Sequence, residues 1–323
     1  MLDRFKRKVD YLRISVTDRC NLRCQYCMPA TGMDWIDRDE ILTYEEIERF
    51  VREVAVPLGI RKLRLTGGEP MVRKDLAGLI ARLAVIPGID DLALTTNGLF
   101  LEQQAQALKL AGLQRINVSM DSLRAERFKE ITRGGDLERV WRGVDAAMAV
   151  GLTPLKLNVV VMAGFNEDEL SDFVGLTLNR PYHVRFIEFM PVGEYELFKQ
   201  VGYVSSQRMR ELITYDLEPT EMTGNGPARY WQVPGALGTV GFISQMSHDF
   251  CSSCNRIRLT ADGKVRHCLL SDHEIDVRGW LRGGTAPAEI QAALEADIQL
   301  KAENHEGALR LSGQSRTMSQ IGG

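Results

Sequence analysis

The stretch Asp18-Arg19-Cys20-Asn21-Leu22-Arg23-Cys24-Gln25-Tyr26-Cys27-Met28-Pro29 carries three cysteines at the spacing C-x3-C-x2-C. It follows residues 11–16, an apolar run that is typical of a β-strand. Three thiolates on one short loop can bind three irons of a four-iron cluster, which usually has four cysteine ligands. The fourth iron then has no protein ligand, and we expect another molecule to bind there.

Strand-like and helix-like stretches alternate along the chain on both sides of this loop. The expected strands are residues 11–16, 62–66, 91–96, 115–120, 154–161 and 183–190. The expected helices are residues 75–85, 101–110, 137–150 and 167–178, preceded by one that starts at the capping box Thr43-Tyr44-Glu45-Glu46. Six strand–helix units predict an α/β fold with a parallel sheet, open or partly closed into a barrel. Active sites of such folds lie at the carboxyl ends of the strands.

The overall composition excludes several classes of function. The 323 residues include 44% hydrophobic and 26% charged residues and carry a net charge of −3, so no global field attracts nucleic acid. The sequence has no apolar run of the roughly 18–20 residues that a membrane-spanning helix needs, and the basic start lacks the apolar segment of a signal peptide. We therefore expect a cytoplasmic protein that binds neither nucleic acid nor membrane.

Polar side chains recur on one face of several expected strands, because residues two apart in a strand share a face. Buried parallel strands are usually apolar on both faces. The polar face is therefore either exposed to solvent or lines a cavity for an anionic ligand, since arginine and lysine suit phosphate oxygens. The residues are Arg13 and Ser15; Lys62, Arg64 and Thr66; Asn117 and Ser119; and Lys156 and Asn158.

The ends of three expected strands carry further polar signals. The glycines of Thr66-Gly67-Gly68-Glu69-Pro70 would let a ligand approach the backbone closely, and Glu69 could accept hydrogen bonds from a ligand amine. Each signal is weak alone, but at successive strand ends they together describe a site. The other two are Thr95-Thr96-Asn97-Gly98 and Ser119-Met120-Asp121-Ser122.

A second group of three cysteines, Cys251, Cys254 and Cys268, has the spacing C-x2-C-x13-C. It favours either a structural zinc ion, with His248, His267 or His273 as fourth ligand, or a second iron–sulfur cluster with an open iron. Arg256 and Arg258 lie two apart beside it, which indicates an anionic ligand next to the metal. The strand–helix pattern ends near residue 215, so we expect a core domain over residues 1–225 and a C-terminal domain over residues 226–323.

The first cysteine motif, with Tyr26 before its last cysteine, resembles the signature of the radical S-adenosylmethionine superfamily. Gly67-Gly68-Glu69-Pro70 resembles that superfamily's motif for the methionine amine. The second triad, its Cys-Asn-Arg-Ile-Arg run and the terminal Gly322-Gly323 narrow the resemblance to the GTP 3′,8-cyclase family of molybdenum cofactor biosynthesis, over about residues 10–323. The resemblance implies an incomplete (β/α)6 TIM-like barrel that a C-terminal domain closes.

The same resemblance implies the chemistry: radical cyclisation of GTP to 3′,8-cyclo-7,8-dihydro-GTP. Cys20, Cys24 and Cys27 would hold a [4Fe-4S] cluster whose open iron chelates S-adenosylmethionine. Cys251, Cys254 and Cys268 would hold a second [4Fe-4S] cluster that meets the guanine. Contacts to S-adenosylmethionine are implied for Tyr26, Gly68, Ser119 and Met190. Contacts to GTP are implied for Arg13, Lys62, Arg64, Thr95, Lys156, Arg185, Arg256 and Arg258, of which Arg13, Arg256 and Arg258 are the candidate catalytic residues.

Partners and alternatives also follow from these residues. The family implies a low-potential electron donor and, downstream, the cyclic pyranopterin monophosphate synthase, while monomer and homodimer both stay open. Gly322-Gly323 is either a loose tail or, as the family implies, a segment that enters the barrel and supports catalysis. One alternative is another radical enzyme with an auxiliary cluster, such as a peptide-maturing enzyme, although these typically have more C-terminal cysteines. The other is a zinc-stabilised module that binds a nucleotide or RNA.

Overall fold

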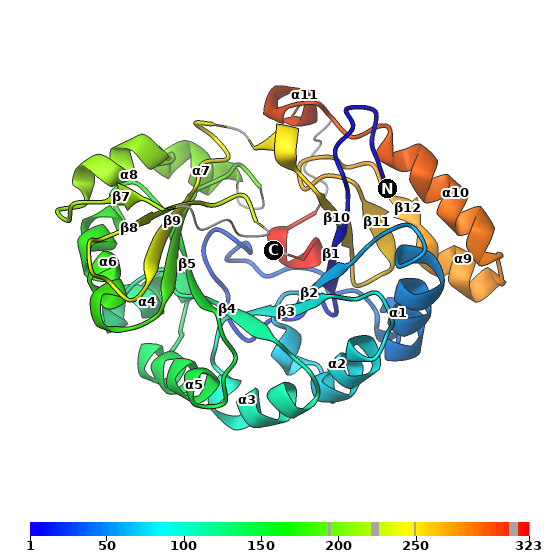
Figure 1. Cartoon of the computed structure of the whole chain (residues 1–323), viewed down its shortest axis with the longest axis horizontal. Coiled ribbons are helices and arrows are strands. Elements are labelled where there is room, and N and C mark those ends of the chain that lie inside the picture. Colours follow the sequence, from blue (N-terminus) through cyan, green and yellow to red (C-terminus); the bar gives the residue numbers. More distant parts are fainter. Residues whose placement is uncertain (193–194, 221–225, 249, 310–315, 323) are drawn as a thin grey trace.

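The computed structural model describes residues 1–192, 195–220, 226–248, 250–309 and 316–322. Its strands form one sheet in the order β12-β11-β10-β1-β2-β3-β4-β5-β6-β9-β8-β7. Figure 1 shows this sheet curving round a central space, with helices outside it and the C-terminus in the middle. The arrangement is a partial α/β barrel, as the strand–helix alternation predicts.

The six expected strands are confirmed, each within two residues of its expected ends. They pair in parallel in chain order from β1 to β6. Their bounds are β1 (Tyr11–Ser15), β2 (Lys62–Thr66), β3 (Asp91–Thr96), β4 (Arg115–Ser119), β5 (Leu155–Val161) and β6 (His183–Glu188).

Strands from the last third of the chain extend both edges of this core. β10 (Arg256–Leu259) pairs in parallel with β1, and β9 (Thr239–Ile243) pairs in parallel with β6. The other late strands pair antiparallel at the margins: β7 (Glu218–Pro219), β8 (Arg229–Gln232), β11 (Lys264–Arg266) and β12 (Ile275–Asp276). One continuous sheet contains strands from both expected domains, so it marks no boundary between them. Residue 225 itself lies outside the described residues, and the division into two domains stays a prediction.

The helices that were expected between the strands are present. The capping box is confirmed, because Thr43 Oγ1 accepts from Glu46 N at 3.1 Å and Glu46 accepts from Thr43 N at 2.8 Å. The helix expected over residues 167–178 begins with a 3-10 turn, Glu167–Glu169. The bounds are α1 (Tyr44–Phe50), α2 (Leu76–Ala84), α3 (Leu101–Leu110), α4 (Ala125–Thr132), α5 (Leu137–Ala149), α6 (Leu170–Asn179), α7 (Tyr195–Val201), α8 (Ser206–Leu212), α9 (Val277–Gly283), α10 (Pro287–Ile298) and α11 (His305–Leu309).

The hydrophobic core lies between the outer face of the sheet and these helices. Leu12, Ile14, Leu63, Leu65 and Leu157 are all fully buried there. The alternate residues of the same strands therefore face the inside of the barrel. In the described part of the chain, no helix is long and apolar enough to cross a membrane.

Candidate active site

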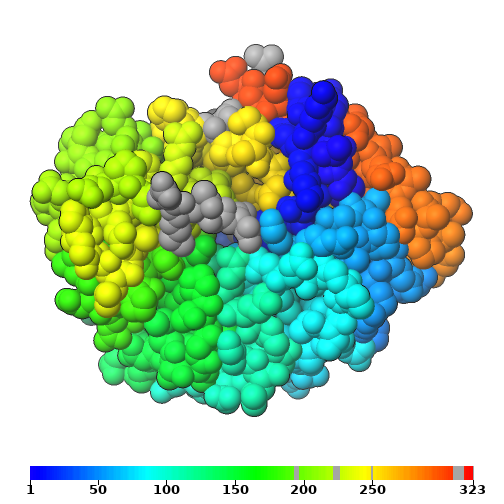
Figure 2. Space-filling view, in the orientation of Figure 1, coloured from blue at the N-terminus to red at the C-terminus, as the bar shows by residue number. Residues whose placement is uncertain are grey.

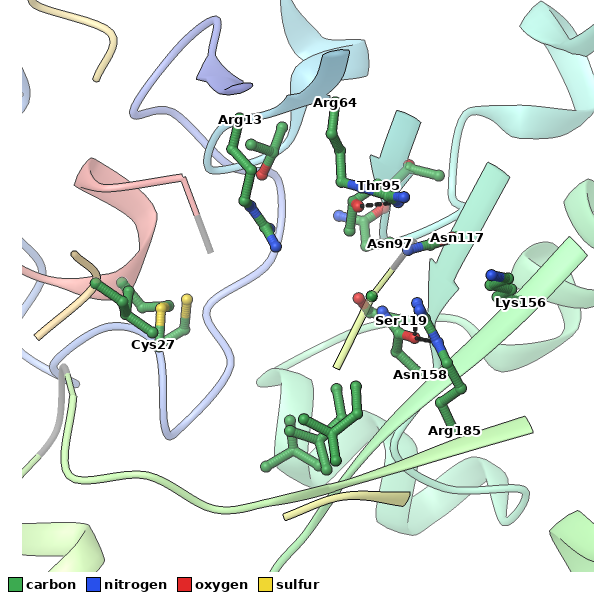
Figure 3. Close-up of a pocket in the computed structure, with 18 of the residues that line it drawn as sticks. Arg13, Cys27, Arg64, Thr95, Asn97, Asn117, Ser119, Lys156, Asn158 and Arg185 are labelled. Atoms are coloured by element: carbon green, nitrogen blue, oxygen red, sulfur yellow. Dashed lines mark hydrogen bonds between the residues drawn. The ribbon is translucent and has the colours of Figure 1, made fainter. Parts of the chain in front are cut away.

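One cavity inside the barrel collects the polar faces of the strands. Strand register places the side chains in rows, because Arg258, Arg13 and Arg64 are neighbours across β10, β1 and β2. Thr95, Asn117 and Lys156 form a second row across β3, β4 and β5, and Ser119, Asn158 and Arg185 form a third across β4, β5 and β6. All nine residues line the cavity, which Figure 3 shows in part.

The cavity is strongly cationic and largely desolvated. Burial, with smaller contributions from neighbouring arginines, lowers the pKa of Lys156 to about 7. Burial also lowers the pKa of Arg185 to about 10, and that of Arg258 to about 10, with Arg256 adding to the shift at Arg258. Positive charges crowded in a low-dielectric cavity disfavour one another, and an anion that neutralises several of them is the expected ligand.

Two of these cations are already oriented by polar neighbours. Arg64 donates to the Tyr11 hydroxyl and to Thr95 Oγ1, the latter at 3.3 Å. Arg185 Nε donates to Asn158 Oδ1 at 2.9 Å, as Figure 3 shows. The fixed guanidinium planes favour a polyoxyanion such as a phosphate chain.

Lys62 does not share this position. It is the first residue of β2, it does not belong to the cavity lining, and its ammonium forms an ion pair with Asp10 at 3.0 Å. Alternation along a strand assigns a face but not a height along the barrel axis. A role of Lys62 in ligand binding therefore stays a prediction.

The first cysteine loop is held by hydrogen bonds from its backbone. Arg23 N donates to Thr132 O at 3.1 Å, and Gln25 N donates to Ile131 O at 2.9 Å, both on α4. The Arg133 guanidinium, just past α4, donates to Met28 O at 2.8 Å. Cys20, Cys24 and Cys27 all line the cavity, and Figure 3 shows Cys27 across it from Lys156 and Arg185.

The glycines after β2 pack against the chain itself. A Cβ on Gly68 would lie 2.4 Å from Asp18 O, and one on Gly67 would lie 2.6 Å from Thr17 O. Gly68 N donates to Thr17 O at 2.8 Å, so these glycines join β2 to the segment just before Cys20. These glycines therefore allow the backbone just before Cys20 to pack closely against the end of β2.

Glu69 is buried, and protein donors surround its carboxylate. Its Oε1 accepts from Met71 N at 3.0 Å and Thr96 Oγ1 at 2.8 Å, and its Oε2 accepts from Asn97 N at 2.7 Å. Burial raises the pKa of Glu69 to about 7. Three protein bonds leave capacity for one further donor at Oε2, so contact with a ligand amine stays a prediction.

The remaining residues expected near S-adenosylmethionine also lie at the cavity. Gly68, Ser119, Met190 and Tyr26 line it. The Tyr26 hydroxyl donates to Asp121 Oδ2 at 2.7 Å, and Val160 N donates to Asp121 Oδ1 at 2.8 Å. This pair ties the cysteine loop to the ends of β4 and β5.

The first triad fits an iron–sulfur cluster. Burial raises the pKa of the Cys20 thiol to about 11 and also raises that of Cys24, to which the nearby Cys27 adds. Thiols with raised pKa values lose their protons when a metal binds them, as metal–thiolate binding requires. Asn97 Nδ2 lies 3.9 Å from Cys20 Sγ and supplies a polar contact to that sulfur.

The second triad lies behind the cavity wall. Its neighbours Phe250, Arg256, Arg258 and Leu269 line the cavity, but the three cysteines themselves do not. Although burial opposes it, Arg256 and then Lys301 lower the pKa of the Cys254 thiol to about 7, so positive surroundings favour the thiolate that a cluster needs.

A single zinc ion fits the second triad less well. Among the described residues, no three His, Cys, Asp or Glu side chains converge as ligands of one metal ion. Two of the candidate histidines contact Asp297, His267 Nδ1 at 3.2 Å and His273 Nε2 at 2.8 Å, and among the described residues the buried Nε2 of His267 has no hydrogen-bond partner. A four-iron cluster binds each thiolate through a different iron, so it needs more widely spaced sulfurs than one ion does.

The C-terminal tail enters the barrel. Arg258 donates to Gly322 O at 2.8 Å and Arg13 donates to the same oxygen at 3.2 Å. A Cβ on Gly322 would lie 3.1 Å from Thr66 and 3.2 Å from Ser15, and its φ of +76° suits glycine. The described tail is thus ordered against the arginine row, whereas Gly323 lies outside the described residues.

Several cavity residues were not singled out from the sequence. Arg115, at the start of β4, lines the cavity beside Lys156 and pairs with Asp91 on β3. Phe250 lies under the Arg256 guanidinium, with 4.8 Å from Cζ to the ring centroid. The alternation rule already places Arg115 on the face of Asn117, whereas nothing local in the sequence indicates the contact of Phe250.

Comparisons with known proteins agree with this geometry. Residues 14–177 match the family model described as the radical SAM superfamily, and residues 182–307 match the one described as Molybdenum Cofactor Synthesis C. A GTP 3′,8-cyclase from Pelotomaculum thermopropionicum is 51% identical over 329 residues, covering 100% of both chains. One from Nostoc punctiforme is 48% identical over 98% of this chain and 99% of its own.

Solved structures support the fold. Streptococcus suis SuiB bound to its precursor peptide SuiA superposes with a TM-score of 0.54 at 13% identity, covering 92% of this chain and 71% of that one. Its S-adenosylmethionine complex superposes with a TM-score of 0.52 at 14% identity, covering 92% and 70%. The GTP 3′,8-cyclases, in contrast, are about 50% identical to this chain over its full length. The chain therefore belongs to the GTP 3′,8-cyclase family of the radical S-adenosylmethionine superfamily.

Proposed function

We propose that this chain catalyses the S-adenosylmethionine-dependent cyclisation of GTP to 3′,8-cyclo-7,8-dihydro-GTP in molybdenum cofactor biosynthesis. The observation that carries the proposal is one cavity lined by three cysteines and by rows of arginine and lysine from neighbouring strands, in a chain about half identical to GTP 3′,8-cyclases throughout its length. The cofactors are two [4Fe-4S] clusters and S-adenosylmethionine.

Cys20, Cys24 and Cys27 would hold the first cluster and Cys251, Cys254 and Cys268 the second. Tyr26, Gly68, Ser119 and Met190 would contact S-adenosylmethionine, because all four lie at the same cavity as the first triad. When bound, the first cluster and S-adenosylmethionine supply the radical that starts the cyclisation. Glu69, buried beside them, would accept from the methionine amine through Oε2.

The cationic rows would bind the nucleotide. Arg64, Lys156 and Arg185 would neutralise the triphosphate, with Thr95 beside Arg64. Arg13 and Arg258, held by the tail carbonyl of Gly322, would position the ribose. Fixed donors lower the barrier mainly by orienting the reacting atoms, and Val160, Ile187 and Ile243 in the lining exclude water from them.

Arg256 is the residue of this set that gives the clearest test of nucleotide binding. Its guanidinium lies on the Phe250 ring at the cavity wall, and its Nε is buried with no acceptor in the described part of the protein. A buried donor without an acceptor costs free energy, which a bound nucleotide would recover. We assign Arg256, with Arg13 and Arg258, to substrate positioning.

The test combines product analysis with cluster analysis. The anaerobically purified chain should contain about eight irons and eight sulfides and convert GTP to the 3′,8-cyclised product. R256A should weaken GTP binding and product formation while uncoupled cleavage of S-adenosylmethionine continues. R142A, on the exposed face of α5, is the matched control. Loss of that cleavage in R256A with both clusters retained would refute the role of Arg256. A colourless, zinc-loaded protein would refute the proposed function.

The wider setting forms part of the same proposal. We place the chain in the cytoplasm, as a monomer or homodimer with a core domain over residues 1–225 and a C-terminal domain over residues 226–323. A low-potential electron donor would reduce it, and the cyclic pyranopterin monophosphate synthase would use its product. We propose no role for nucleic acid.

A further inference from the structure

Lys301 is a buried lysine beside the second cysteine triad. It follows α10 and is only 3% exposed. Its ammonium donates to Arg256 O at 3.1 Å and to His267 O at 2.5 Å. Lys301 also contributes to lowering the pKa of the Cys254 thiol. Both hydrogen bonds of the ammonium are therefore directed at the segments that carry Cys254 and Cys268.

This charge has no acidic partner in the described part of the chain. None of the ion pairs there includes Lys301, and the buried acid Asp297, at the end of α10, contacts His267 and His273. Arg256 and Arg258 place further positive charge close by. A buried ammonium without a counter-ion is unfavourable, so an anion is expected to bind near it.

The N-terminal segment fixes Lys301 in this place. Arg7 donates to Cys251 O at 2.8 Å and to Ala302 O at 2.8 Å, and its guanidinium also pairs with Asp3. Figure 2 shows the N-terminal segment packed between the segment around residue 250 and the C-terminal helices. One guanidinium thus holds the loop of Cys251 against the segment of Lys301.

We propose that Lys301 is the counter-ion and hydrogen-bond donor of the second cluster, and that it sets the reduction potential of that cluster. The inference rests on the proposed function, because it requires an iron–sulfur cluster at Cys251, Cys254 and Cys268. Charge and hydrogen bonds at the ligand sulfurs are what a protein uses to tune such a cluster. A positive charge beside the sulfurs favours the reduced, more negative cluster.

The test measures a potential instead of turnover. The full chain is reconstituted anaerobically in a C20A/C24A/C27A background, so that only the second cluster contributes to a redox titration followed by electron paramagnetic resonance. K301M should lower the equilibrium constant for one-electron reduction by at least about tenfold, equal to about 59 mV. K301R keeps the charge and should shift it less. K264M removes a lysine that pairs with Asp276 at the margin of the sheet, and is the control.

Each outcome decides the proposal. A K301M potential equal to that of K264M would overturn it. If K301M loses the second cluster, iron is counted in the chain with all six cysteines: loss of about four irons with the first cluster retained supports the proposal, and loss of both clusters overturns it. Zinc in place of iron at the second triad would instead refute the cofactor assignment, and an iron-loaded wild type that forms no cyclised product would refute the proposed function alone.

Discussion

Lys156 should make GTP binding depend on pH. Its ammonium faces charged or titratable groups on several strands, and burial lowers its pKa to about 7. A triphosphate beside it would raise that pKa, so binding takes up a proton when the pH exceeds 7. The groups around it are Arg64, Asp91, Arg115, His183, Arg185 and the Tyr230 ring.

The sign and size follow from this linkage. Below pH 7 the free protein already carries the charge and binding is strongest, whereas above pH 7 each unit weakens binding by up to about tenfold until the pKa of the complex is reached. We expect about a tenfold loss of affinity from pH 6 to pH 8. K156R stays charged throughout and should flatten this dependence.

Calorimetry in buffers of different ionisation enthalpy measures the affinity and the proton uptake together. The γ-phosphate of GTP also titrates, with a second pKa of about 6 for phosphate esters, and K156R shares that titration, so the difference between the two proteins isolates Lys156. Equal pH profiles for wild type and K156R, or no proton uptake at pH 8, would refute the reasoning.

Two further predictions concern elements that support the site. Glu188 is fully buried and accepts hydrogen bonds from Ser206 N, Met246 N and Ser247 N, each at 2.7–2.8 Å. E188Q leaves donors without an acceptor and should lower the free energy of unfolding by roughly 3 kcal/mol. Its melting temperature should therefore be lower than that of the exposed control E211Q, and equal melting temperatures would contradict the prediction. G322A places a Cβ 3.1 Å from Thr66 at a φ of +76°, which costs about 1–2 kcal/mol of conformational strain. This change should lower the rate of cyclisation roughly tenfold while both clusters are retained. G283A is the control and should keep full activity; full activity of G322A would contradict the role of the tail.

Most of the barrel could be predicted from the sequence because the signals for its strands and helices lie within a few neighbouring residues. The alternation of Leu12 and Ile14 with Arg13 reports the buried face of β1, and the same rule holds along β2 and β4. The capping box at Thr43 is complete within four residues. Cys20, Cys24 and Cys27 likewise lie on a single loop, so the first triad can be recognised from the sequence before any fold is known.

Features made by distant segments were not predictable in this way. α4, which supports the first cysteine loop, was not expected, and neither was the pairing of β9 and β10 with the two edges of the core. Lys62 shares a face with Arg64 yet pairs with Asp10 near the start of the strand. Glu69 was expected to meet a ligand, and the structure surrounds it with protein donors first.

The sequence by itself determined the secondary structure of the core, the two cysteine triads and the cationic character of one strand face, because each depends on residue types and spacings within a short stretch of chain. Only the tertiary structure decided which of these residues meet. Strand register aligned Arg258, Arg13 and Arg64, chain closure brought Gly322 to two of them, and burial placed Lys301 against the second triad. Such contacts join residues that lie tens to hundreds of positions apart, which local propensity does not encode.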